Sequence, residues 1–250
     1  MNLRPDEALT GQFAKLAVDP DASEWDAAVL VNRVIDPDVG EVSIQPLLAA
    51  DSGMRGESSW RVLGQLGFRG DDDALRNLDN SCIARVMERR RGLPITLALV
   101  LIELARSRGE QAWGLNTPGH FLAQVKGEVI DPVNMAPLSI TGDLPRADTV
   151  DVALRMLNNI KQVCLERRQP HSVLVILEHQ RGLAEALQND GLAAGLHLES
   201  GNCWFKLNMA ELARDHFEAC AELAPEGSEM QRNAQMRIRL LGKSRPPTLH

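Results

Sequence analysis

The sequence predicts an α+β fold, in which a mostly helical domain with a small antiparallel sheet precedes an all-helical domain. Three observations lead to this prediction. The stretch 93–106 is apolar at almost every position, as expected of a helix buried on all sides. Directly after it the hydrophobic period changes from helical to alternating, and from residue 149 onward no strand pattern appears. With 250 residues, the chain can hold one large domain or two modest ones.

Short helices are expected before the central helix. Two lie between residues 5 and 34, and Ser23 suits the cap of the second. Two more are expected over 43–50 and 58–66, on the same grounds of helical spacing. A further helix, capped by one of the residues 79–81, leads into the basic run before the central helix.

The junction with the central helix is marked by a glycine and a proline. Gly92 suits the left-handed stop of the preceding helix, and Pro94 suits the first turn of the next. Arg89, Arg90 and Arg91 complement the dipole of the helix that they end. The alternative is an anion pocket that these three arginines form with the N-terminus of the central helix.

A small antiparallel sheet is predicted after the central helix. Strands are expected over 112–115 and 120–125, and a two-residue turn at 126–127 leads into a third strand. With that register, Val125 faces Glu128 and Leu122 faces Asp131. His120 and Asp131 then lie on one sheet face as diagonal neighbours, close enough for a hydrogen bond. Residues 132–148 lack periodicity and are interpreted as a linker.

The C-terminal part carries a pattern typical of tetratricopeptide repeats. Small, aromatic and proline residues stand at the expected offsets: Gly201, Trp204, Ala213, Phe217, Cys220 and Pro225. The small residues let two antiparallel helices approach, and the aromatic rings fill the space between them. A weaker copy lies upstream at Ile160, Cys164, Val173 and Leu177. Stacked helical hairpins form concave surfaces, so a protein or peptide partner is expected for this domain.

Composition argues against several classes of function. The formal net charge of −7 is unfavourable for a nucleic-acid or anionic-membrane binder. A polar N-terminus and four cysteines without a CxxC pair favour a cytoplasmic protein with reduced thiols. Four scattered histidines without ligand spacing are interpreted as surface or groove residues: His171, His179, His197 and His216. No metal and no cofactor are therefore expected.

One set of residues could carry nucleophilic chemistry. Cys82, His120 and Asp131 are the residue types that acyl transfer needs: a thiolate, a histidine that activates it, and a carboxylate that orients the histidine. The alternative is structural, because a His–Asp hydrogen bond can join two strands and a cysteine can simply fill space in a core.

Four motifs together resemble the SirB1 family. They are Asp79-Asn80-Ser81, the run from Glu88 to Thr96, Pro118-Gly119-His120-Phe121 and Ile130-Asp131-Pro132. The resemblance implies a transglutaminase-like domain, expected over 1–140, followed by tetratricopeptide repeats over 149–250. It also implies an association with regulation in bacteria.

The resemblance also implies where catalytic residues would stand. In active transglutaminase-like enzymes the nucleophilic cysteine begins the central helix, and histidine and aspartate follow on the strands. His120 and Asp131 match the last two roles. The cysteine position falls near Pro94 or Ile95, neither of which carries a nucleophilic atom.

The leading interpretation is therefore a pseudoenzyme, a non-catalytic binding, scaffold or regulatory protein in the cytoplasm. Its partner is expected to be a protein or peptide held by the repeat domain. The alternative is a cysteine-dependent acyl transferase, amidase or peptidase that uses Cys82, His120 and Asp131.

Overall fold

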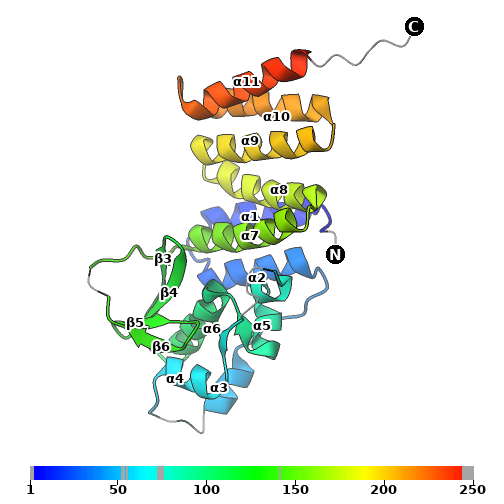
Figure 1. Cartoon of the computed structure of the whole chain (residues 1–250). Helices are drawn as coiled ribbons and strands as arrows, with labels where there is room; N and C mark the ends of the chain where they lie inside the picture. The colour runs from blue at the N-terminus through cyan, green and yellow to red at the C-terminus, as the bar shows by residue number, and fades with distance from the viewer. Residues whose placement is uncertain (1–2, 52–53, 55, 72–75, 141, 244–250) are drawn as a thin grey trace. The chain divides into compact units, whose positions relative to one another are not determined.

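A computed structural model describes residues 3–51, 54, 56–71, 76–140 and 142–243 (Figure 1). The chain divides into two compact units. The sheet unit comprises residues 20–163, and the helical unit combines residues 1–19 with residues 164–250. Helix α7 (Thr149–Glu166) runs across the boundary between these two segments of sequence. The domain bounds 1–140 and 149–250 stay predictions. By contacts, the N-terminal helix belongs to the same compact unit as the C-terminal helices.

The sheet unit contains short helices and two small sheets before α7. In chain order its elements are α2 (Glu24–Ile35), α3 (Gln45–Asp51), α4 (Ser59–Gln65), β1 (Arg69–Gly70), η1 (Leu78–Ser81), α5 (Ile83–Arg89), β2 (Arg91–Gly92), α6 (Pro94–Ser107), β3 (Ala112–Thr117), β4 (His120–Val125), β5 (Glu128–Asp131) and β6 (Ala136–Leu138). The short helices and the strands β3, β4 and β5 agree with the sequence patterns that predict them, whereas β1 and β2 were not predicted.

Helix α6 forms the core of the sheet unit, as its composition predicts. Every residue from Ile95 to Ala105 is buried except Glu103. The helix contacts β3 and β4 as well as α2, α3, α4 and α5, so it has neighbours on all sides. Each large aliphatic side chain buried there contributes about 1.5–3 kcal/mol relative to exposure.

The four-stranded antiparallel sheet has the strand order β3-β4-β5-β6. The predicted register is confirmed where the ladder is formed, because Val125 pairs with Glu128. Gly114 of β3 is needed for packing, since a Cβ atom there would lie 2.6 Å from the Phe121 ring. The interpretation of 132–148 as a linker is wrong. Its residues form β6, and backbone hydrogen bonds from Asn116 to Pro145 and from Ala147 to Gly114 bind it to β3.

Two expectations at the junction before α6 are wrong. The left-handed residue that ends α5 is Arg90, with φ 57°, and not Gly92. Gly92 is required for a different reason, because its Cβ would lie 2.7 Å from Thr96 Oγ1. The N-cap of α5 is Cys82 and not one of the residues 79–81, which form the short helix η1.

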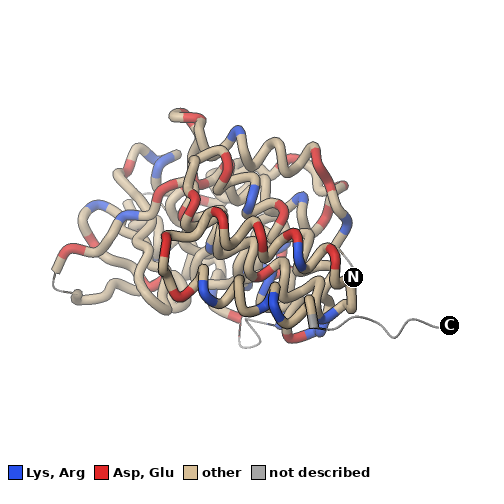
Figure 2. Tube along the Cα trace, turned by 90° about the horizontal axis from the view of Figure 1, so that it is seen from above, with Lys and Arg blue, Asp and Glu red and all other residues tan. Residues whose placement is uncertain are grey.

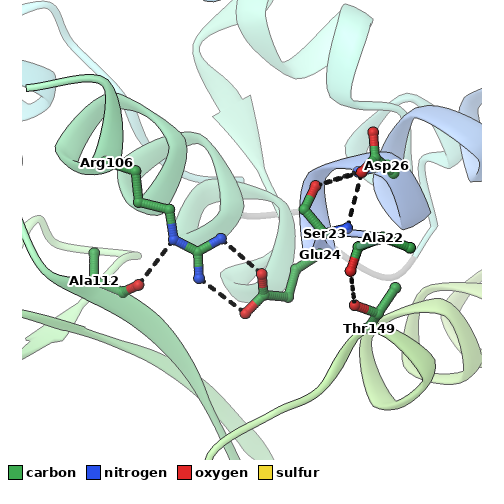
Figure 3. A network of polar contacts seen from close by, with 7 residues as sticks. All are labelled: Ala22, Ser23, Glu24, Asp26, Arg106, Ala112 and Thr149. Carbon is green, nitrogen blue, oxygen red and sulfur yellow. Dashed lines mark hydrogen bonds and ion pairs between the residues drawn. The ribbon is translucent and has the colours of Figure 1, made fainter. Parts of the chain in front are cut away.

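An ion pair joins α2, α6 and β3 (Figure 3). The Nη atoms of Arg106 in the last turn of α6 donate to both oxygens of Glu24, at 2.7 and 3.1 Å. Arg106 Nε also donates to the carbonyl of Ala112, at 3.0 Å. Ser23 caps α2 through a reciprocal pair of hydrogen bonds with Asp26, as its sequence position predicts. Burial raises the pKa of Glu24, but hydrogen bonding and the charge of Arg106 outweigh it, so the pKa lies below 4.5.

The helical unit stacks α8 (Pro170–Ala186), α9 (Asp190–Lys206), α10 (Ala210–Leu223) and α11 (Glu229–Lys243) in chain order (Figure 1). Helix α1 (Glu7–Val18) packs on α8. A Cβ atom at Gly182 would lie 2.8 Å from Thr10 Cγ2, so the two helices approach closely there. Leu3 N donates to Ser172 Oγ at 3.1 Å and fixes the segment before α1. The N-terminal helix therefore belongs to the core of this unit.

The hairpin of α9 and α10 has the close packing that its sequence predicts. A Cβ atom at Gly201 would lie 2.5 Å from the Phe217 ring, so only glycine allows this approach. Phe217 is buried together with Ala213, and Trp204 packs against the same cluster. These contacts follow from the spacing of small and aromatic residues, while the assignment to tetratricopeptide repeats stays a prediction.

One of the four histidines, His179, departs from the expectation that they lie at the surface or in a groove. His179 is 1% exposed, its Nδ1 bonds Thr10 Oγ1 at 2.8 Å, and burial lowers its pKa to about 4. His197 and His216 are half-buried and share an Nδ1–Nδ1 hydrogen bond of 2.9 Å. Of these four histidines, only His171 is exposed. The surface interpretation is therefore wrong for His179, because α1 covers it.

The Glu24–Arg106 pair predicts a pH-dependent loss of stability. We expect Glu24→Gln to lower the free energy of unfolding at pH 7 by about 2–3 kcal/mol, because the Arg106 charge loses its partner. The folded pKa is lowered, so the pair stabilises the fold above about pH 4.5, and this contribution disappears as the pH falls through the folded pKa. Urea unfolding should therefore show a smaller difference between wild type and variant near pH 3. A difference that stays constant with pH would contradict this account.

We expect a second loss of stability at low pH from His179. Its cause is burial of the neutral imidazole and not the loss of an ion pair. Because its folded pKa is about 4 and its ordinary value is 6.5, the unfolded chain takes up the proton first as the pH falls. The Tm of the wild type should fall between pH 7.5 and pH 5, and His179→Gln should reduce this fall. The control is His171→Gln on the same helix, which should keep the wild-type slope. Equal slopes for all three proteins would show that His179 is not responsible.

Candidate functional site

His120 and Asp131 line the same hollow of the sheet unit, with a volume of about 530 Å³. His120 begins β4 and is exposed, whereas Asp131 ends β5 and is half-buried. Leu122 lies on the same wall, as expected for residues on one sheet face. The remaining lining residues are Thr117, Val133, Asn134, Leu138, Ile140 and Leu144. The hollow therefore combines a few polar groups with a mostly apolar lining.

The carboxylate of Asp131 holds the turn after β5. Its Oδ1 accepts from the backbone nitrogen of Val133 at 2.9 Å, and its Oδ2 accepts from Asn134 Nδ2 at 2.6 Å. Within the described part of the chain, no hydrogen bond joins His120 to Asp131. The His–Asp hydrogen bond expected from the register is thus not formed, because Asp131 is engaged by its own turn.

Cys82 lies outside this hollow. Its side chain is fully buried at the N-terminus of α5, and it is not part of the lining. Burial raises the pKa of the Cys82 thiol despite nearby backbone hydrogen bonds and the charge of Arg85. A buried thiol with a raised pKa is a poor nucleophile. The structure thus brings His120 and Asp131 to one hollow and leaves Cys82 apart from them.

The first three residues of α6 present no accessible nucleophilic side chain. Pro94 occupies the first turn, and Ile95 is 1% exposed. The next residue, Thr96, is also buried, and its hydroxyl lies in hydrogen-bond contact with the carbonyls of Asn80 and Leu93, at 2.9 and 3.0 Å. This hydroxyl therefore fixes η1 to the start of α6 and is not directed to a substrate.

The arginine run is used to hold neighbouring segments. Arg89 donates to Asn80 Oδ1 at 3.0 Å and pairs with Asp71 at 3.1 Å. Asn80 is fully buried, so this contact ties the end of α5 to η1.

The next two arginines reach a different segment, the one that follows α4. Arg90 donates to the carbonyl of Leu66, and Arg91 donates to that of Gly67, at 2.6 and 2.8 Å. The same segment continues into β1, which pairs in parallel with β2. Because the three guanidinium groups go to separate acceptors, the structure does not assemble them into one anion pocket.

Two residues that position this region were missed at the level of sequence. Asn32 of α2 is fully buried, and its Oδ1 accepts from the backbone nitrogen of Ile83 at 2.7 Å. This bond replaces the capping hydrogen bond that the side chain of Cys82 does not form. Arg155 of α7 donates to Asn116 Oδ1 and to the carbonyl of Thr117, at 2.6 and 3.1 Å. For Asn32 the available signal is a polar residue between Ala28, Val29 and Ile35 on one helix face, whereas Arg155 has polar neighbours on its face and gives no such signal.

The described residues contain no group of three or more His, Cys, Asp or Glu side chains that could hold a metal ion. In the same part of the chain, no helix is both long and apolar enough to cross a membrane.

Sequence comparisons show which known proteins this chain is similar to. Residues 59–174 match the model of the transglutaminase-like superfamily, a range that includes α6 and the hollow. A UPF0162 protein of Xylella fastidiosa strain Temecula1 is 36% identical over 123 residues, which cover 46% of this chain and 41% of that protein. A UPF0162 protein of strain 9a5c gives the same values. The chain thus spans well under half the length of these two relatives.

A longer alignment joins the chain to a UPF0162 protein of Pseudomonas aeruginosa. The two are 25% identical over 219 residues, which cover 80% of this chain and 77% of that protein. No solved structure matches the chain significantly. Residues 59–174 therefore carry a transglutaminase-like domain, and the chain is similar to bacterial UPF0162 proteins.

Proposed function

We propose that this protein is a non-catalytic binding and scaffold protein, in which a transglutaminase-like domain of the SirB1 type has lost its nucleophile. The observation that carries this proposal is the position of the only cysteine between residues 20 and 163. Cys82 is fully buried and lies outside the hollow that contains His120 and Asp131. The start of α6 supports the proposal, since Pro94 and Ile95 stand where the family's cysteine is expected.

The chemistry of thiols explains why this arrangement does not favour catalysis. The thiolate is the reactive form, and catalytic cysteines lower their pKa with a nearby cation, a metal or an exposed helix N-terminus. Burial has the opposite effect on Cys82. His120 lacks the carboxylate partner that would orient its ring, because Asp131 bonds Val133 and Asn134 instead. The three residues therefore lack the contacts of a catalytic triad.

The binding role is assigned to the helical unit, which we interpret as tetratricopeptide-like. Stacked helical hairpins give surfaces that hold extended partners, and the close approach at Gly201 and Phe217 is the packing that such repeats need. A protein or peptide partner in the cytoplasm fits this architecture. The net charge of −7 supports a partner other than nucleic acid or an anionic membrane.

The competing function, a cysteine-dependent acyl transferase, amidase or peptidase, is tested by thiol reactivity. In the whole protein, we expect iodoacetamide to label Cys82 slowly at every pH below about 8, because the thiol is buried and protonated. His120→Ala and Asp131→Asn should leave this rate unchanged. The measurement is peptide mapping by mass spectrometry after timed labelling across a pH series.

Two comparisons calibrate the rate. Cys164 is also buried with a raised pKa, so it serves as an internal reference for a packed thiol in the same sample. Protein unfolded in guanidinium gives the labelling rate of accessible thiols. Rapid labelling of Cys82 near pH 6 that disappears in His120→Ala would overturn the proposal and support the enzyme.

A further inference from the structure

A second hollow lies entirely within the helical unit. It has a volume of about 440 Å³, within the range of ligand pockets, which is ~300–1,000 Å³. Its walls come from the segment that leads into α1, from α8 and from α9. Leu174 and Val175 of α8 and Trp204 of α9 supply its apolar surface. None of the site residues of the sheet unit lines this hollow, and Trp204 is the one residue of the repeat pattern in its described lining.

The polar part of this hollow carries one sign of charge. Asp6, Glu7 and Glu178 line it, and no Lys or Arg is part of the described lining. This is a local property, because acidic and basic positions are interspersed along the trace as a whole (Figure 2). Carboxylates beside an indole ring favour a cation, which gains from the charges and from the face of the ring.

The three carboxylates are engaged to different degrees by the protein itself. Asp6 caps α1, since its Oδ1 accepts from the Leu9 nitrogen at 2.9 Å. Glu178 contacts Arg181, which lies one turn further along α8. Glu7 is exposed, and within the described chain it forms no ion pair. Glu7 is thus the carboxylate with the most capacity to accept an external cation.

We propose that this hollow, the α1–α8 pocket, docks a basic and apolar segment of a partner protein. A Lys or Arg side chain of the segment pairs with Glu7 and Glu178, and a neighbouring apolar side chain packs on Leu174 and Trp204. This inference rests on the proposed binding function and names the chemistry of the partner. It also gives the N-terminal segment a role, because that segment supplies part of the wall.

The test is a binding measurement on the whole protein with defined peptides. The probe is a fluorescein-labelled nonapeptide of alternating lysine and leucine, followed by fluorescence anisotropy at about pH 7.5 and low salt. One comparison peptide replaces lysine with glutamate, and a second replaces leucine with serine. We expect the lysine–leucine peptide to bind about tenfold more tightly than either, since both charge and apolar contact contribute.

Variants then locate the binding. Glu7→Gln combined with Glu178→Gln should weaken binding of the lysine–leucine peptide about tenfold. Glu7→Lys combined with Glu178→Lys should reverse the preference toward the glutamate peptide. The matched control is Glu218→Gln, which removes an exposed carboxylate of the same unit outside the pocket and should leave binding unchanged. Circular dichroism of each variant confirms that the helices are retained.

The outcomes separate this inference from the proposed function. Wild-type affinity in the double glutamine variant, or an equal loss in Glu218→Gln, would overturn the α1–α8 pocket as the docking site. The same holds if the wild type binds none of the peptides. None of these results affects the reactivity of Cys82, on which the non-catalytic proposal is tested independently.

Discussion

The sheet unit depends on the burial of α6 on all sides. A helix without a polar face needs apolar neighbours around its whole circumference, and here the sheet and four short helices supply them. The polar groups that must still be buried near this helix are then placed at its two ends. Thr96 and Asn80 connect its start to η1, and Arg106 connects its last turn to Glu24.

The run from Glu88 to Thr96 has a structural role at this junction. Its arginines donate to the carbonyl groups and side chains of neighbouring segments, its glycine makes room for Thr96, and its proline begins α6. The run from Glu88 to Thr96 thus serves the packing of the junction at which α6 begins. Close packing at this junction is a sufficient physical reason for these residue types.

Much of the fold could be predicted from the sequence, because hydrophobic periodicity and turn residues act locally. The buried central helix, the hairpin register at Val125 and Glu128 and the cap at Ser23 all follow from such patterns. Two errors are local, at the end and at the cap of α5, and the others concern contacts between distant segments. Residues 132–148 lack periodicity yet bind to β3, and His179 is covered by a helix far away in sequence. At the candidate site, the common sheet face of His120 and Asp131 followed from register, and a packed Cys82 was one of the two interpretations of that residue. The engagement of Asp131 by its own turn did not follow from the sequence.

The pairing of α1 with α8 has a consequence for how the chain is made. Helix α1 is synthesised before its partner α8, which follows only after more than a hundred further residues, the whole sheet unit among them. During translation the apolar face of α1, with Leu9 and Phe13, has no native surface to cover it until α8 leaves the ribosome. The residues of the sheet unit are all synthesised before α8, so this unit can fold before the helical unit closes. Helix α1 is thus made early in its own unit, but it reaches its native contacts only when α8 follows.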